Sequence, residues 1–183
     1  MTPPSANEPV NETGSLTLEQ ALNEHEVNAA IVDVEEPSQQ LVLFRVAGQR
    51  FALLGSVVKE IISHDQPVYC VPGLPPTTEG VLHLRGHIES VIQLNVLMGL
   101  PLPNVTQPGM ILLVSAAGIR SGVRIEQLDD VCDVPTSLLQ PPPDTLSSAL
   151  RPYVSALWQP QEGVTAVLLD AETLFKAYQD GLG

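Results

Sequence analysis

The sequence predicts an all-β fold with short helices. Its 183 residues are 44% hydrophobic, enough to bury a sizeable core as one domain or as two small barrels that share an interface. Only 4% of the residues are aromatic, so Val, Leu and Ile must fill that core, which favours strands. Short apolar runs alternate with turns that contain Gly or Pro, a pattern typical of all-β proteins.

Residues 1–38 differ in composition from the rest and are expected to form an acidic, mostly disordered N-terminal extension. They contain eight acidic residues and no Lys or Arg. Within them Thr17-Leu18-Glu19-Gln20 fits a capping box, which predicts a short helix to about Asn28. This segment is either a partly formed, solvated helix or a docking peptide for a partner or for the chain's own barrel.

The folded region, residues 39–183, begins with strands. Residues 41–46 form an apolar run, 47–50 a turn, and 51–53 a second strand. Residues 57–62 follow, where β-branched side chains surround the charged pair Lys59 and Glu60.

Residues 79–94 read as a β-hairpin. Apolar residues alternate up to a turn at Arg85-Gly86-His87, and an apolar run from Ile88 to Leu94 resumes after it. If Arg85 is drawn into the fold, its guanidinium needs a carboxylate partner, because an unpaired buried charge is very costly.

The second half continues the strand pattern after a linker-like stretch. Residues 100–109 are rich in Pro and are the best internal boundary. Strands are expected over 110–114 and 119–125, and residues 138–143 form a stiff, proline-rich spacer rather than an SH3 ligand. Residues 164–169 predict a strand, followed by a helix that is capped near Asp170.

Charge and targeting signals limit the function. The net charge is −13 with only eight Lys and Arg, which disfavours nucleic-acid binding and an anionic membrane face. No signal peptide or membrane-spanning stretch is recognisable, so no membrane insertion and a cytoplasmic location are expected. Cys70 and Cys132 are expected to be reduced thiols in the core.

Catalytic and metal-binding patterns are missing from the sequence. There is no G-x-S-x-G elbow and no glycine-rich phosphate loop. His83 and His87 have the H-x-x-x-H spacing, but this spacing brings two histidines together only on a helix, and Gly86 predicts a turn. We therefore expect no enzyme activity, no metal and no cofactor.

Several motifs in sequential register resemble the CheW-like family, the adaptors of bacterial chemosensory arrays. Gly80-Val81 with Leu84-Arg85-Gly86 resembles "G-V-x-N-L-R-G", and Val58-Lys59-Glu60-Ile61 resembles "V-x-E-I". Further matches are "G-x-x-(F/Y)-x-(I/L)" over residues 48–53, a proline loop over 69–76, "G-(I/L)-x-V-D-x-V-x-(D/E)-V" over 122–131, "I-x-P-x-P" over 138–143 and "(I/L)-L-L-D-x-(E/D)-(K/R)-L-(F/L)" over 167–175. The resemblance covers about residues 40–178. The chain departs from the family at His83, Ser90, Gln93, Glu126 and Trp158.

The resemblance implies two small five-stranded SH3-like barrels packed together. It also implies a non-catalytic adaptor that couples methyl-accepting chemoreceptors to a CheA-type histidine kinase. One barrel would dock on the regulatory domain of the kinase, a groove between the barrels would hold the receptor tip, and other CheW-like domains are a further class of partner. The protein would then be cytoplasmic and recruited to membrane-associated receptor arrays.

Carried over from the family motifs, the partner-binding positions are Val58, Glu60, Gly80, Arg85, Met110, Ile111 and Val131. Glu60 and Arg85 are expected to form a structural salt bridge that holds the site in shape, which supplies the carboxylate that Arg85 needs. Replacing Val58 or Ile111 by Asp is expected to abolish receptor binding without unfolding the protein.

Two other readings stay open. The chain is alternatively a divergent scaffold of a pilus-motility, phototaxis or surface-sensing pathway, with Ser90, Gln93 and the acidic N-terminal extension as signs of altered partners. More distantly, it is a small ligand-binding or enzymatic β-barrel whose pocket uses Glu60, His83 and His87.

Overall fold

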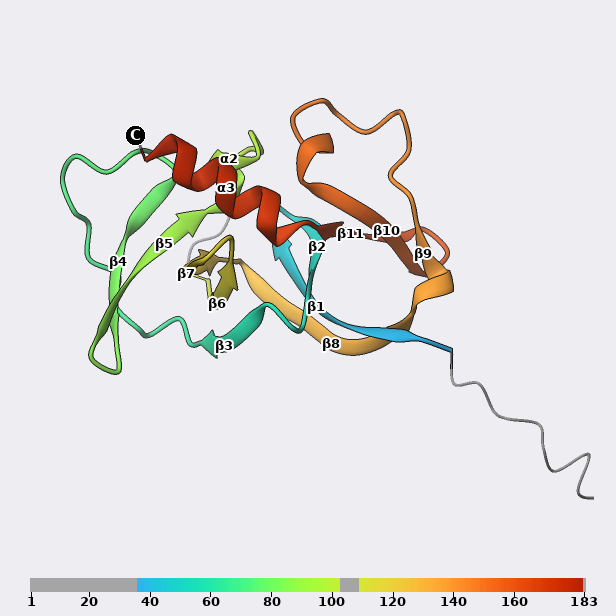
Figure 1. Ribbon diagram of the computed structural model, residues 1–183, viewed down its shortest axis with the longest axis horizontal. Coiled ribbons are helices and arrows are strands. Elements are labelled where there is room, and N and C mark those ends of the chain that lie inside the picture. Colours follow the sequence, from blue (N-terminus) through green and yellow to red (C-terminus); the bar gives the residue numbers. More distant parts are fainter. Residues whose placement is uncertain (1–35, 103–108, 183) are drawn as a thin grey trace, which may run out of the picture. The chain divides into compact units, whose positions relative to one another are not determined.

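The computed structural model describes residues 36–102 and 109–182, in which strands form two antiparallel-rich sheets (Figure 1). The expected helix over residues 17–28 therefore lies outside the described residues, as does the acidic extension apart from residues 36–38. The all-β fold class with short helices is confirmed.

One sheet has five strands in the order β3-β6-β7-β5-β4. Its strands are β3 (Val58–Ile62), β4 (Thr78–Leu84), β5 (His87–Gln93), β6 (Ile111–Ala116) and β7 (Ile119–Arg124). Residues 100–109, expected as an internal boundary, connect the short helix α2 (Leu94–Leu97) to β6. Because β5 and β6 belong to the same sheet, this segment connects strands within the five-stranded sheet.

The other sheet has six strands in the order β8-β1-β2-β11-β10-β9. Its strands are β1 (Ser38–Val46), β2 (Gln49–Leu54), β8 (Gln127–Pro135), β9 (Leu139–Gln140), β10 (Val154–Gln161) and β11 (Val164–Leu169). Single 3-10 turns, η1 (Thr136–Leu138) and η2 (Arg151–Tyr153), directly precede β9 and β10. This sheet has one strand more than expected, because β9, with two residues, pairs with β10.

Tight turns join three of the strand pairs. Arg85-Gly86, between β4 and β5, has positive φ at both residues, as do Ala47-Gly48 and Ala117-Gly118. Two consecutive left-handed residues are the signature of the type I′ turn, whose twist matches that of the flanking strands. The second residue of each turn is glycine, which adopts positive φ without steric cost because it has no Cβ.

Three apolar clusters hold the fold together. Each sheet has a small cluster of its own, which includes Ile111 in the five-stranded sheet and Leu168 in the six-stranded sheet. The largest cluster lies between the sheets and takes side chains from both: Phe44 and Phe51, whose rings lie 6.4 Å apart, come from the six-stranded sheet, and Leu112 comes from the five-stranded sheet. Each small sheet thus has its own hydrophobic core, and the two sheets share a third core between them, as expected for two barrels packed together.

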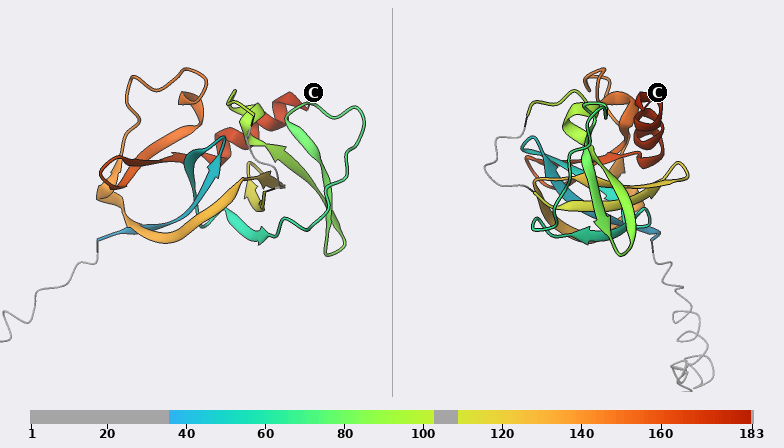
Figure 2. Two further views of the ribbon diagram at one scale, coloured as in Figure 1. Left: turned by 180° about the vertical axis from the view of Figure 1, so that it is seen from behind. Right: turned by 90° about the vertical axis from the view of Figure 1, so that its left-hand side faces the viewer.

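The last helix, α3 (Ala171–Gly181), connects the two sheets. It follows β11 of the six-stranded sheet, and its N-cap is Asp170, whose carboxylate accepts hydrogen bonds from the amides of Glu172 and Thr173. The helix runs across to the five-stranded sheet (Figures 1 and 2). There the buried Tyr178 hydroxyl lies 2.8 Å from Thr78 Oγ1. The C-terminal helix thus fastens one sheet to the other.

Candidate functional site

The candidate site begins at two edge strands. β3 ends the five-stranded sheet and β8 ends the six-stranded sheet. Both strands direct apolar side chains toward the cluster between the sheets, and several of these remain partly exposed. We call this set, together with Met110, the residue before β6, the inter-sheet surface; its residues are Val58, Ile61, Met110, Leu128 and Val131.

On β3, a bulge determines which side chains lie on the face that belongs to the inter-sheet surface. Val58 pairs with Val114 of β6, but Glu60 pairs with Leu113, so Lys59 is an extra residue in the strand. Directly paired residues share a face of a sheet. Val58 therefore lies on the face of Val114, which belongs to the inter-sheet cluster, whereas Glu60 lies on the opposite face.

Ile61 was missing from the motif-based set, and the same bulge explains its position. Ile61 pairs with Leu112, a buried member of the inter-sheet cluster, and is itself 38% exposed. Regular alternation would place Ile61 on the face opposite to Val58. No sequence signal marks the bulge, although an apolar residue beside Glu60 indicates that both faces of β3 are used.

On β8, two residues complete the surface. Val131 pairs with Val42 and Leu128 pairs with Phe44, and both partners are buried in the inter-sheet cluster. Val131 is 42% exposed, and Leu128 is half-buried against the cluster. Their side chains thus continue the apolar cluster to the surface along a free sheet edge.

Met110 joins the surface from the residue before β6. It is half-buried, packs against the inter-sheet cluster, and its carbonyl accepts a hydrogen bond from the Ile125 amide at 3.0 Å. The backbone is therefore fixed while the flexible thioether stays partly accessible. Methionine at such a position suits adaptable protein contacts.

Acidic side chains flank the surface on β8. Asp130 and Asp133 are exposed on either side of Val131 and Cys132. Burial, with the nearby charges of Asp130 and Asp133, raises the pKa of the Cys132 thiol, which therefore stays protonated at neutral pH. Cys132 is half-buried, and Cys70 is exposed in the loop after β3, so the expectation that both thiols lie in the core was wrong for Cys70.

Glu60 and Arg85 form the ion pair that was expected, with Arg85 Nη2 2.9 Å from Glu60 Oε1. Arg85 comes from the tight turn between β4 and β5, and its side chain is 77% exposed. Such a pair adds little to stability, about 0–1 kcal/mol. The pair lies on the face of β3 opposite to Val58, so it is not part of the inter-sheet surface.

Ile111 and Gly80 need correction as contact residues. Ile111 has no exposed surface and sits in the private core of the five-stranded sheet with Ile62, so replacing it by Asp would damage the fold. Gly80 is buried on β4, where an added Cβ would clash with the carbonyl oxygen of Tyr69. That close approach lets Tyr69 pair with Val81 through two backbone hydrogen bonds. Both residues support the sheet and are not available to a partner.

Ser90 and Gln93, which differ from the family motif, lie on β5 and form hydrogen bonds within the five-stranded sheet. The Ser90 hydroxyl lies 2.7 Å from that of Ser121 on β7, and the backbone N–H of Gln93 donates to the Thr77 carbonyl at 2.8 Å. Both residues are half-buried. The Ser90 side chain therefore serves a contact between strands of the sheet, whereas the Gln93 bond is made by the backbone and does not depend on the side chain.

The histidine-based alternative has no support from the geometry. In the β4–β5 hairpin, Leu84 pairs with His87 and His83 pairs with Ile88. Because neighbouring pairs face opposite sides, His83 and His87 point away from each other and form no pocket with Glu60. Within residues 36–102 and 109–182, no three His, Cys, Asp or Glu side chains cluster as metal ligands would. In the same part of the chain, no helix is long and apolar enough to cross a bilayer.

Comparisons with known proteins agree on the family. Residues 40–179 match the model of the CheW-like domain. A chemotaxis protein CheW of Bacillus subtilis is 29% identical over 106 residues, which cover 58% of this chain and 67% of that protein. A probable chemotaxis protein CheW of Rhizobium etli is 23% identical over 80% of this chain and 93% of its own length.

A solved structure shares the fold. The crystal structure of the scaffolding protein TtCheW from Thermoanaerobacter tengcongensis superimposes with a TM-score of 0.67 at 21% identity. The match covers 76% of this chain and 94% of that one. Together with the family model, which spans most of the chain, these similarities show that the chain belongs to the CheW-like family of non-catalytic chemotaxis scaffold proteins.

Proposed function

We propose that this chain is an adaptor that couples methyl-accepting chemoreceptors to a CheA-type histidine kinase. Membership of the CheW-like family and relatives named chemotaxis protein CheW support this role. The single observation that carries it is the inter-sheet surface, in which two strands at sheet edges of the described part of the chain expose apolar residues beside the buried inter-sheet cluster.

The inter-sheet surface is suited to a helical partner. Four of its apolar residues stand on the edge strands β3 and β8 and Met110 precedes β6, and an exposed apolar surface of this kind fits the apolar face of an amphipathic helix. The residues are partly buried, so their positions are set before a partner arrives, and less conformational entropy is lost on binding. We assign the receptor tip to this surface.

The kinase arm uses another part of the molecule. One of the two barrels docks on the homologous regulatory domain of the kinase, and related CheW-like domains dock in the same way. A small adaptor with two separate docking sites links its partners, and repeated linkage builds an array through effective concentration. In this role the protein works in the cytoplasm and is recruited to membrane-associated receptor arrays.

A pull-down with the full-length chain as bait tests this proposal. Proteins are captured from the source cell and identified by mass spectrometry. Recovery of both a histidine kinase and a coiled-coil receptor supports the coupling role. Recovery of neither, by a chain whose circular dichroism shows that it is folded, contradicts it.

A further inference from the structure

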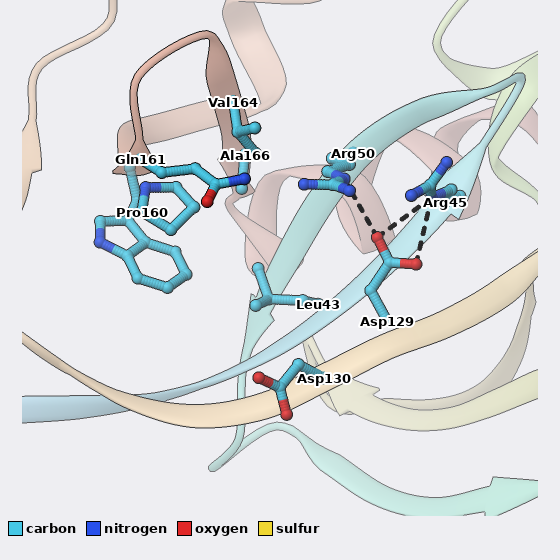
Figure 3. A pocket seen from close by; sticks show the side chains of 10 residues that line it. Leu43, Arg45, Arg50, Asp129, Asp130, Pro160, Gln161, Val164 and Ala166 are labelled. Atoms are coloured by element: carbon cyan, nitrogen blue, oxygen red, sulfur yellow. Dashed lines mark hydrogen bonds and ion pairs between the residues drawn. The ribbon is translucent and has the colours of Figure 1, made fainter.

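A second site lies on the inner face of the six-stranded sheet, away from the inter-sheet surface. A pocket of about 400 Å³ opens there between the β10–β11 hairpin and strands β1, β2 and β8 (Figure 3). Its volume is within the range of small-molecule pockets, and barrel mouths are common places for such sites. The residues that line it are Leu43, Arg45, Arg50, Asp129, Asp130, Trp158, Pro160, Gln161, Val164 and Ala166.

One side of the pocket holds two facing cations. Arg45 on β1 and Arg50 on β2 are directly paired across the strands, an arrangement that like charges normally disfavour. Asp129 holds them together: its carboxylate lies 3.1 Å from Arg45 Nε and 3.2 Å from Arg50 Nε. Figure 3 shows both guanidinium groups directed at this one carboxylate.

A bulge in β8 places Asp129. Leu43 pairs with Asp130 and Phe44 pairs with Leu128, so Asp129 is the extra residue between them. Bulges of this kind re-aim a side chain, and here the carboxylate reaches both arginines. The local structure thus builds a triad of two cations and one anion at the mouth of a barrel.

The terminal Nη groups of Arg45 and Arg50 remain available to hydrogen-bond a ligand. Both arginines engage Asp129 through Nε, and within the described part of the chain no hydrogen bond from their terminal Nη groups is present. Both side chains are about one-third exposed, so the Nη groups can meet a ligand. Guanidinium groups with paired N–H donors bind carboxylates in a bidentate manner.

The rest of the pocket is mainly apolar. Leu43, Val164 and Ala166 line it together with Pro160 and the indole of Trp158. Asp130 is exposed and accepts a hydrogen bond from the Val131 amide at 2.8 Å. The triad carries one net positive charge and Asp130 adds a negative charge nearby, so a monoanion fits better than a dianion such as phosphate.

We propose that this pocket binds a small monocarboxylate with an aromatic or branched apolar body. The carboxylate lies on the Nη groups of Arg45 and Arg50, and the apolar body packs against Trp158, Leu43 and Val164. The binding step is non-covalent. It is independent of the receptor contact proposed above, because the pocket and the inter-sheet surface lie on opposite faces of β1 and β8.

The chain supplies its own reporter for this site. Trp158 is the single tryptophan of the 183 residues, so its fluorescence reports on the pocket alone. The full-length protein is titrated with 4-phenylbutyrate, and 4-phenylbutyramide serves as the neutral analogue of the same shape. We expect a saturable change with the carboxylate and an affinity at least about tenfold weaker for the amide, because a charge-assisted pair is lost.

Two variants and a control complete the test. Arg50→Gln removes one guanidinium and leaves the Arg45–Asp129 pair, and we expect it to weaken carboxylate binding by about tenfold or more. Val164→Phe fills the apolar side without changing charge and is expected to block binding as well. Arg151→Gln breaks a surface pair with Asp144 outside the pocket and should bind as the natural protein does.

The opposite results overturn the proposal. These are no saturable fluorescence change with the carboxylate, equal affinity for acid and amide, or unchanged affinity in folded Arg50→Gln and Val164→Phe proteins. Circular dichroism checks that each variant is folded. If Arg50→Gln does not fold, the Val164→Phe protein and the comparison of acid with amide decide the outcome.

Discussion

Val58 and Glu60, two residues apart on β3, face opposite sides of the five-stranded sheet. The cause is Lys59, which is inserted as a bulge between the pairs Val58–Val114 and Glu60–Leu113. Val58 therefore joins Ile61 on the side of the inter-sheet cluster, and Glu60 turns to the side where Arg85 reaches it. The apolar contact and the ion pair of one short motif are thus separate features with separate tests.

Ile61→Glu is expected to weaken binding of a receptor cytoplasmic fragment by at least about tenfold, because a charge replaces an apolar contact at the centre of the surface. Ile61 is partly exposed, so the fold should tolerate the change. Isothermal titration calorimetry with the fragment measures the affinity. The matched control is Ile88→Glu, which alters an isoleucine that is 73% exposed on the β4–β5 hairpin. Equal affinity of the two variants would contradict the assignment of this surface.

Ile111→Ala should destabilise the fold by about 2–5 kcal/mol, because it leaves a cavity in the private core of the five-stranded sheet. Urea denaturation followed by circular dichroism gives the free energy of unfolding. A variant of natural stability would mean that Ile111 is a surface residue after all.

Arg85→Ala should change the free energy of unfolding by less than about 1 kcal/mol, because its pair with Glu60 is largely exposed to solvent. The same urea experiment measures it, at low and at high salt. A loss of several kcal/mol would show that the pair is structural, as the family motif implies.

Gly80→Ala is expected to cost about 1–3 kcal/mol, because the new methyl group collides with the Tyr69 carbonyl and opens the Tyr69–Val81 bridge. Gly181→Ala, at the end of α3, is the matched control, since nothing lies within 4 Å of a Cβ there. Similar thermal midpoints for the two variants would refute the close approach.

Asp129→Asn should lower stability at neutral pH, and the difference from the natural protein should shrink in acid. Although partial burial opposes it, hydrogen bonds from Gln127 and Arg45 and the charges of Arg45 and Arg50 lower the Asp129 pKa below its ordinary 3.8. A lowered folded-state pKa stabilises the fold fully above pH 3.8, and this contribution is lost as the pH falls through the folded pKa. Urea midpoints of both proteins across this range measure the effect; a constant difference would contradict it.

Local features of this fold were predictable from the sequence. Gly48, Gly86 and Gly118 mark the tight turns, because a type I′ turn requires positive φ. Asp170 marks the start of α3, because its side chain can accept hydrogen bonds from the first turn. Apolar alternation then locates most of the strands to within a few residues.

Long-range features were not predictable from single-residue patterns. The bulges at Lys59 and Asp129 shift the alternation of side chains between the two faces of the strand, so residues beyond each bulge lie on the face opposite to the expected one. Neither residue type predicts a bulge. The pair Thr78–Tyr178 spans 100 residues, so no local rule brings α3 onto the other sheet. Motif transfer therefore selected partly exposed residues on two edge strands, Val58 and Val131, but mixed them with the core residue Ile111 and left out the exposed Ile61.

The adaptor role is tested most directly by reconstitution with three purified components: the full-length chain, a receptor cytoplasmic fragment and a CheA-type kinase. Co-sedimentation of the kinase with the immobilised receptor fragment is measured with and without the chain. We expect the kinase to be retained only when the chain is present, and Ile61→Glu to abolish retention while the variant still binds the kinase alone. Retention that does not depend on the chain, or a folded chain that binds neither component, would contradict the account.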